Sequence, residues 1–149
     1  MRSMLRRLVV PLALLASAAL LPATVTAQTW QYLGQWGSAG TGPGQFAGTD
    51  FPISVATDVA GNVYAADPGN HRVLKFSSAG AYVAQWGSLG SGNGQFNRPV
   101  GVGTDGAGNV YVADYNNNRI QKFTSTGAYL TKWGSAGGGN GQMISPTGI

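Results

Sequence analysis

Residues 108–123 read GNVYVADYNNNRIQKF, and this stretch decides the fold because an earlier part of the chain repeats it. Residues 61–76 read GNVYAADPGNHRVLKF, so the same pattern stands 47 positions apart. Both copies contain short runs rich in Val, Ile, Tyr and Phe that are bounded by Gly, Asn and Asp, the pattern of strands joined by tight turns. Self-similarity at a fixed period of this length indicates a repeat architecture.

Each repeated unit divides into four strand-like pieces. In the second unit these pieces are residues 99–105, 109–114, 119–125 and 128–134, and no segment follows a helical period over ten residues. Blades of four antiparallel strands recur about every 40–50 residues in β-propellers. The fold class that we predict is therefore all-β, a β-propeller of four-stranded antiparallel blades with about two and a half blades present.

The repeat also predicts how the chain is divided. We expect a signal peptide at 1–27 and an incomplete propeller at 28–149. Within the propeller we place a fourth-strand piece, two blades and the start of a further blade, at about 29–37, 51–88, 98–135 and 146–149. A repeat array needs about three or more units to cover its faces. We therefore favour an N-terminal fragment of a longer propeller, and the alternative is self-association of copies through exposed blade faces.

The first 27 residues have the composition of a secretory signal peptide. Arg2, Arg6 and Arg7 precede a short apolar run, and the small residues before and at Ala27 are typical of a cleavage site. The apolar run is shorter than the roughly 20 residues that span a bilayer. We predict cleavage after Ala27, a secreted or periplasmic location, and no stable membrane insertion after cleavage.

Charge and cysteine content argue against several classes of site. Three of the nine Lys and Arg residues lie in the predicted leader, so six remain against five acidic residues. Binding to nucleic acid needs clustered positive charge to replace the counterions of the phosphates, and we expect no nucleic-acid partner. The chain has no Cys, which excludes a disulfide framework and thiolate metal sites.

A glycine-rich stretch occurs three times, as WGSAGTGPGQF at 36–46, WGSLGSGNGQF at 86–96 and WGSAGGGNGQM at 133–143. A phosphate-binding loop would need a helix after the glycines, and none is expected here. We interpret the stretch as the joint between blades, where glycine permits a sharp bend and close backbone approach. A Trp ring would then fill the gap between blades, and a Phe would anchor the far end.

These linked motifs resemble a known family. GQF-x-x-P-x-G-V, D-x-x-G-N-V-Y-V-A-D and N-x-R-I-Q-K-F are similar to the NHL repeat, and the resemblance covers the chain from about Trp30 to Ile149. It implies a propeller, most often six-bladed. The chain departs from the name motif because Asn118 replaces His in the second unit, and Arg72 and Arg119 replace Leu.

Recurrence separates structural from functional candidates, because a residue that returns in each unit serves the blade whereas an active site is assembled once. We expect the recurring Asp and Arg residues to pin the loop between the second and third strands, with a ligand role as the alternative. We expect Asp58 and Asp105 to cap turns and Lys75 and Lys122 to be solvated. The predicted structural positions are Trp36, Trp86, Trp133, Asp67, Asp114, Phe46 and Phe96.

The candidate ligand surface gathers on the top face, the end of each blade that carries the loop between its second and third strands. His71 is the only histidine, and its pattern favours a hydrogen-bonding loop residue over a zinc ligand, which would need several partners. No catalytic pair, metal site or cofactor is predicted. The candidate surface residues are His71, Arg72, Tyr115, Asn118, Arg119 and Arg98.

The sequence predicts an exported scaffold that binds a protein, peptide or glycan on this top face, without catalysis in this segment. The alternative comes from the resemblance, since similar exported propellers include metal-dependent lyases and lactone hydrolases. The chain would then be the N-terminal part of such an enzyme, with its active site in other blades. RNA binding, which occurs among intracellular relatives, conflicts with the predicted leader and the charge.

Overall fold

The computed structural model describes residues 34–48 and 54–149. The predicted signal peptide at 1–27 lies outside these residues, as do residues 29–33 of the predicted fourth-strand piece.

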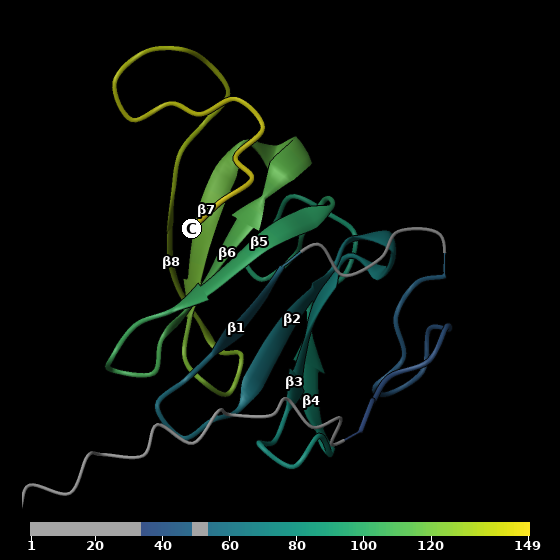
Figure 1. The fold of residues 1–149 in the computed structure, drawn as a ribbon. Coiled ribbons are helices and arrows are strands. Elements are labelled where there is room, and N and C mark those ends of the chain that lie inside the picture. The colour runs from purple at the N-terminus through teal and green to yellow at the C-terminus, as the bar shows by residue number, and fades with distance from the viewer. Residues whose placement is uncertain (1–33, 49–53) are drawn as a thin grey trace, which may run out of the picture. The chain divides into compact units, whose positions relative to one another are not determined.

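Within the described residues, eight strands form two four-stranded antiparallel sheets (Figure 1). The first sheet has the order β1 (Val55–Thr57), β2 (Val63–Asp67), β3 (Arg72–Phe76) and β4 (Tyr82–Trp86). The second has the order β5 (Pro99–Thr104), β6 (Val110–Asp114), β7 (Arg119–Phe123) and β8 (Tyr129–Trp133). Two 3-10 turns, η1 (Pro68–Asn70) and η2 (Tyr115–Asn117), join the second and third strands of each sheet. The predicted fold class, an all-β propeller built of four-stranded antiparallel blades, is confirmed.

The two sheets have the same register, which shows that the repeat is structural as well as sequential. Asp67 pairs with Arg72 at the end of the β2–β3 ladder, and Asp114 pairs with Arg119 at the end of the β6–β7 ladder. Each fourth strand has one extra residue where it meets the end of the third strand, Val83 in β4 and Leu130 in β8. An extra residue of this kind increases the local twist of a strand pair.

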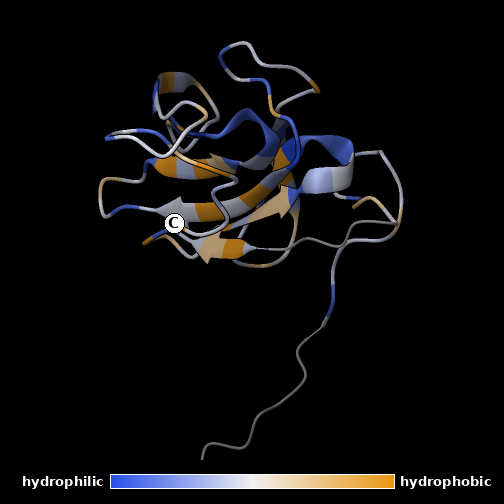
Figure 2. Ribbon diagram, turned by 90° about the horizontal axis from the view of Figure 1, so that it is seen from above, coloured by the Kyte–Doolittle hydropathy of each residue, from blue (hydrophilic) through white to orange (hydrophobic). Residues whose placement is uncertain are grey.

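The core lies between the two sheets, because β5 of the second sheet packs against β1 and β2 of the first. Tyr64, Val73 and Phe96 are fully buried there together with Val112 and Phe123. Alternation along each strand sends these apolar side chains to the face that meets the other sheet. Coloured by hydropathy, the strands hold most of the hydrophobic residues, while several connecting loops are hydrophilic (Figure 2).

Two predicted strand pieces do not form ladders. Residues 34–37 and residues 146–149 contain no strand. A strand needs a hydrogen-bonded neighbour, and no described strand supplies a ladder to either piece. The last residues nevertheless pass close to β5, since a Cβ at Gly101 would lie 2.6 Å from the carbonyl oxygen of Thr147.

Candidate functional site

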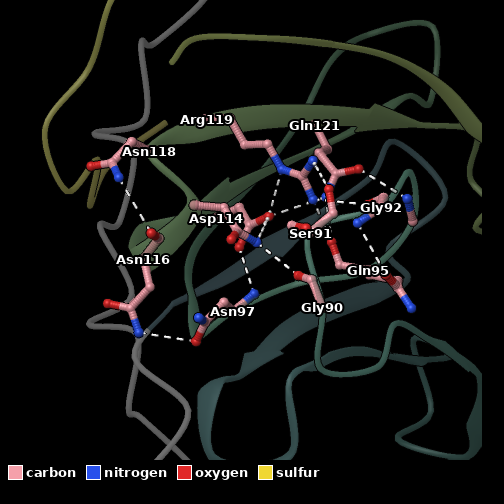
Figure 3. A network of polar contacts seen from close by, with 12 residues as sticks. Gly90, Ser91, Gly92, Gln95, Asn97, Asp114, Asn116, Asn118, Arg119 and Gln121 are labelled. Atoms are coloured by element: carbon pink, nitrogen blue, oxygen red, sulfur yellow. Dashed lines mark hydrogen bonds and ion pairs between the residues drawn. The ribbon is translucent and has the colours of Figure 1, made fainter. Parts of the chain in front are cut away.

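The recurring Asp and Arg of each blade form a buried ion pair, and Figure 3 shows the pair of the second blade. In the second blade, Nε of Arg119 donates to Oδ2 of Asp114 at 2.7 Å, and the two residues are 5% and 0% exposed. The first blade repeats the pair, with Nε of Arg72 donating to Asp67 at 2.9 Å. An ion pair this deeply buried requires further hydrogen bonds to offset the desolvation of both charges.

Those further bonds reach the glycine-rich stretch that enters the blade. Both terminal nitrogens of Arg119 donate to backbone carbonyls, those of Ser91 at 2.7 Å, Gly92 at 2.9 Å and Gln95 at 2.8 Å. Asp114 in turn accepts the N–H of Asn97 at 2.7 Å. The pair therefore fastens the joint between blades, and not only the β6–β7 loop that the sequence suggested.

The first blade fastens its own entering stretch in the same way. Arg72 donates to the carbonyls of Thr41 at 2.7 Å, Gly42 at 3.2 Å and Gln45 at 2.8 Å. The N–H of Ala47 donates to Asp67 at 3.1 Å. The burial of Arg72 and Arg119 contradicts their place among the candidate surface residues, because their guanidinium groups are already occupied beneath the loop.

The glycine-rich stretch is a folded joint closed by its own glutamine. Oε1 of Gln95 accepts the N–H of Gly92 at 3.0 Å, and Gln45 and Gln142 close their own loops in the same way. A parallel bridge joins Leu89 to Phe96, which brings the two ends of the stretch together. The geometry therefore has the form of a structural joint.

Trp86 lies across the boundary between the blades. Its ring is 5.9 Å from that of Phe123 and 6.2 Å from that of Tyr64, and it covers Gly127, where a Cβ would lie 2.8 Å from the indole. Phe96 lies 5.5 Å from Phe123 at the far end of the joint. Trp36 and Phe46 make the equivalent contacts with Phe76, and Trp133 contacts Tyr111 but remains 42% exposed.

His71 and Asn118 occupy equivalent places in the two blades, although His71 is the only histidine of the sequence. Both follow a 3-10 turn and have a left-handed backbone with a φ of 53°. Nδ1 of His71 accepts the N–H of Arg98 at 3.1 Å, and Oδ1 of Asn118 accepts the N–H of Ser145 at 2.9 Å. Each side chain thus holds the chain where it enters the next blade. The hydrogen-bonding role of His71 was predicted from the sequence, but the equivalent role of Asn118 was missed because a different residue type performs it.

Arg98 and Tyr115 meet on the same end of the second blade. The guanidinium carbon of Arg98 lies 5.8 Å from the centre of the Tyr115 ring, within the range of a cation–π contact. Beside them, Nδ2 of Asn116 donates to Oδ1 of Asn97 at 3.0 Å. Asn116 is exposed and the other three are half-buried. We call Asn97, Arg98, Tyr115 and Asn116 the top patch.

The opposite end of each blade carries a tight turn capped by an aspartate. Asp105 accepts the N–H groups of Ala107 and Asn109 at 3.0 and 2.8 Å, and the side chains of Asn109 and Tyr111 at 2.7 and 2.9 Å. The hydrogen bonds from Asn109 hold the pKa of Asp105 well below its usual range. These contacts account for the carboxylate as a turn cap.

Asp58 makes the same contacts in the first blade. It accepts hydrogen bonds from Asn62 and Ala60, and the hydroxyl of Tyr64 donates to it at 2.9 Å. Burial opposes the ionisation of Asp58, but these hydrogen bonds outweigh it and lower its pKa. Burial and the bond to Asp58 in turn raise the pKa of Tyr64.

The two recurring lysines differ in their surroundings. Nζ of Lys75 donates across the blade boundary to the carbonyl of Ser125 at 3.0 Å, which contradicts its expected solvated role. Nζ of Lys122 lies 5.0 Å from the Tyr111 ring and 3.7 Å from Asp105. Tyr111 and Asp105 together raise the pKa of Lys122. Lys75 therefore contributes to the contact between the blades, because the second blade covers it.

The remaining features offer little chemistry. Within residues 34–48 and 54–149, no three His, Asp or Glu side chains converge. In the same part of the chain no helix is long and apolar enough to cross a membrane. Two hollows of about 660 and 330 Å³ open beside Trp36, and the residues that line them carry no ionisable side chain.

Two sheets of four antiparallel strands, joined by a folded stretch and packed face to face, define consecutive blades of a β-propeller. The family model of the NHL repeat matches residues 49–76 and 96–123. These two segments of the chain therefore match the NHL repeat, as the motifs predicted.

Among solved structures, the chain is similar to the hydrazine synthase of Kuenenia stuttgartiensis, with a TM-score of 0.51 and 8% identity over 65% of this chain and 25% of that one. It is also similar to the WD40 repeats of RRP9, with a TM-score of 0.47 and 10% identity over 61% of this chain and 26% of that one. A luciferin-regenerating enzyme has a TM-score of 0.41 and 21% identity over 54% of this chain and 29% of that one.

At these identities the likeness is one of fold alone, and the chain spans between a quarter and a third of each solved protein. No curated protein matches the sequence.

Proposed function

We propose that this protein is an exported binding scaffold that holds a protein, peptide or glycan ligand on the top patch. One observation carries the proposal. Arg98, Tyr115 and Asn116 come from two separate segments and converge. Tyr115 and Asn116 do not recur in the first blade, where Pro68 and Gly69 stand, and Ser145 takes the place of Arg98 at the next joint. Residues that recur are used by the blade itself, so this departure from the repeat needs another explanation.

The chemistry of the top patch suits polar ligands with a flat or aromatic element. Arg98 supplies a permanent positive charge and fork-shaped donors that match carboxylates. Tyr115 offers an apolar ring with a polar tip, and Tyr and Arg are enriched among the residues that dominate binding energy. The side-chain amides of Asn97 and Asn116 add donors and acceptors suited to peptide groups or sugar hydroxyls.

The scaffold beneath the patch supports precise placement. The N–H of Tyr115 donates to the carbonyl of Arg98 at 3.3 Å, and the N–H of Asn116 donates to the carbonyl of Asn97 at 3.1 Å. Asp114 lies directly below and is itself held in the buried ion pair. A preorganised surface loses less entropy when it binds. Export is proposed from the basic and apolar N-terminal residues.

Binding can be tested with an array of defined glycans and a displayed peptide library. We expect the protein to select ligands, and Arg98→Ala and Tyr115→Ala each to weaken binding by about tenfold or more, as for residues at the centre of an interface. Lys132→Ala is the matched control, because it also removes a positive charge, but from an exposed position on the outer strand β8. Selection of no ligand, or equal binding by all three variants, would contradict the proposal.

A further inference from the structure

Two equivalent hydrogen bonds each tie one blade to the chain that enters the next, and their acceptors are different residue types. His71 accepts the N–H of Arg98 through Nδ1, and Asn118 accepts the N–H of Ser145 through Oδ1. The backbones of the two acceptors match, as do those of the two donors, which have φ values of 60° and 49°. An amide oxygen accepts at any ordinary pH. An imidazole changes its charge between about pH 5 and 8.

The tie at His71 depends on the neutral imidazole. Nδ1 can accept a hydrogen bond only when the single ring proton is on Nε2. In the imidazolium form both ring nitrogens carry protons, so Nδ1 would face the N–H of Arg98 as a second donor. The hydrogen bond is then lost. Asn118 cannot undergo this change.

Arg98 needs this tie because its backbone is unusual. A φ of 60° lies in the left-handed region, which non-glycine residues occupy only when their surroundings hold them there. The carbonyl of Arg98 is bonded to the N–H of Tyr115 within the second blade, whereas its own N–H is bonded to His71 in the first. Loss of the second bond removes this tie between Arg98 and the first blade, while the bond to η2 remains.

The other charged groups on the segments around His71 are accounted for. Asp67 and Arg72, its neighbours on η1 and β3, are bonded to each other at 2.9 Å. The chain at Gly87, where a Cβ would lie 2.8 Å from the carbonyl of His71, carries no charge over Trp86–Ser88. Among the described residues of the entering segment, Arg98 is charged, and its guanidinium lies against Tyr115.

We propose that His71 is a pH-sensitive latch on the top patch, which holds Arg98 in its left-handed conformation at neutral pH and releases it when the imidazole is protonated. The effect on ligand binding rests on the function proposed above. The effect on the Arg98 backbone does not, since it follows from the hydrogen bond alone.

The test is the amide hydrogen exchange of Arg98 in the full chain, measured by NMR and expressed as a protection factor at several values from about pH 8 to about pH 5. We expect protection of Arg98 to fall about fivefold or more towards the acidic end, as the loss of one hydrogen bond requires. Protection of Ser145, which Asn118 holds, should stay constant. His71→Asn copies the second blade, so it should keep Arg98 protected over the whole range.

Constant protection of Arg98 in the wild-type protein would overturn the latch, and so would an equal acidic loss in His71→Asn. These measurements need no ligand, so the latch can fail while the top patch still binds, or hold while the arrays select nothing. Where the arrays do supply a peptide or glycan, its affinity should weaken at the acidic end for the wild type and not for His71→Asn. An equal weakening in both would overturn the link between latch and binding.

Discussion

Replacing Asp114 by Asn tests whether the buried ion pair holds the joint between blades. Asp114 is fully buried and accepts hydrogen bonds from Asn97, Asn117, Arg119 and Gln121, at 2.7, 2.9, 2.7 and 3.3 Å. The change keeps the shape and one acceptor oxygen but removes the charge. Arg119 is then left 5% exposed without a counter-charge.

Breaking one side of a buried ion pair costs about 3–5 kcal/mol. We expect Asp114→Asn to lower the free energy of unfolding by about 3 kcal/mol, because the amide oxygen still accepts one donor, and Asp114→Ala by about 5 kcal/mol. Urea unfolding followed by circular dichroism measures this loss. With a slope of about 2 kcal/mol per molar urea, the midpoint for Asp114→Asn should fall by about 1.5 M.

The first blade supplies a matched variant, since Asp67→Asn removes the charge of the equivalent pair and should cost a similar amount. Asp105→Asn is the control at an aspartate whose side chain is 31% exposed, and it should cost clearly less. A loss below about 1 kcal/mol for Asp114→Asn, the range of an exposed pair, would refute the reasoning.

Three other changes test the joint and the turns. Gly87→Ala should cost about 2 kcal/mol or more in urea unfolding, because φ is 109° and the new methyl would lie 2.8 Å from a backbone carbonyl oxygen. Gly106→Ala, with no atom within 4 Å, should be nearly neutral, and equal losses would contradict this. Trp86→Ala should cost about 3 kcal/mol and Trp133→Ala about 1 kcal/mol, because the first ring lies between blades and the second is 42% exposed. Calorimetry that gives the opposite order would be inconsistent with the packing. The pKa of Asp105 is lower in the folded state than its ordinary value of 3.8, so the ionised side chain stabilises the fold at pH values above 3.8. This contribution is lost as the pH falls towards the folded-state pKa. Unfolding midpoints should thus drop below about pH 4, and a pH dependence unchanged in Asp105→Asn would argue against this role.

The strands could be predicted from the sequence because their ends carry strong local signals. Gly108, for example, has a φ of 81° and ends the turn before β6, a conformation that glycine adopts without cost. The observed strands of the second blade end within two residues of the predicted pieces. The pieces at 29–37 and 146–149 stay predictions, and their described residues form no ladder, because a ladder depends on a partner and not on the local sequence.

The partners of Arg119 could not be predicted in the same way. The recurring Asp and Arg suggested an ion pair, and the structure contains it. The guanidinium also donates to three carbonyls of the glycine-rich stretch, and a backbone carbonyl leaves no trace in residue identity. The available signal was that the pair and the closing Gln95 occur together in each unit.

The contacts made at equivalent positions of the two blades identified structural residues better than the residue types at those positions did. Arg98 and Tyr115 depart from the repeat in identity and in their cation–π contact, and they remain the candidates for binding. His71 departs in identity alone, because Asn118 makes the same hydrogen bond in the next blade. An imidazole in a place that an amide fills equally well adds one property that the amide lacks, a change of charge near neutral pH. The two blades thus supply both the hypothesis and its control, and substitution of one blade's residue into the other separates the structural role from the chemical one.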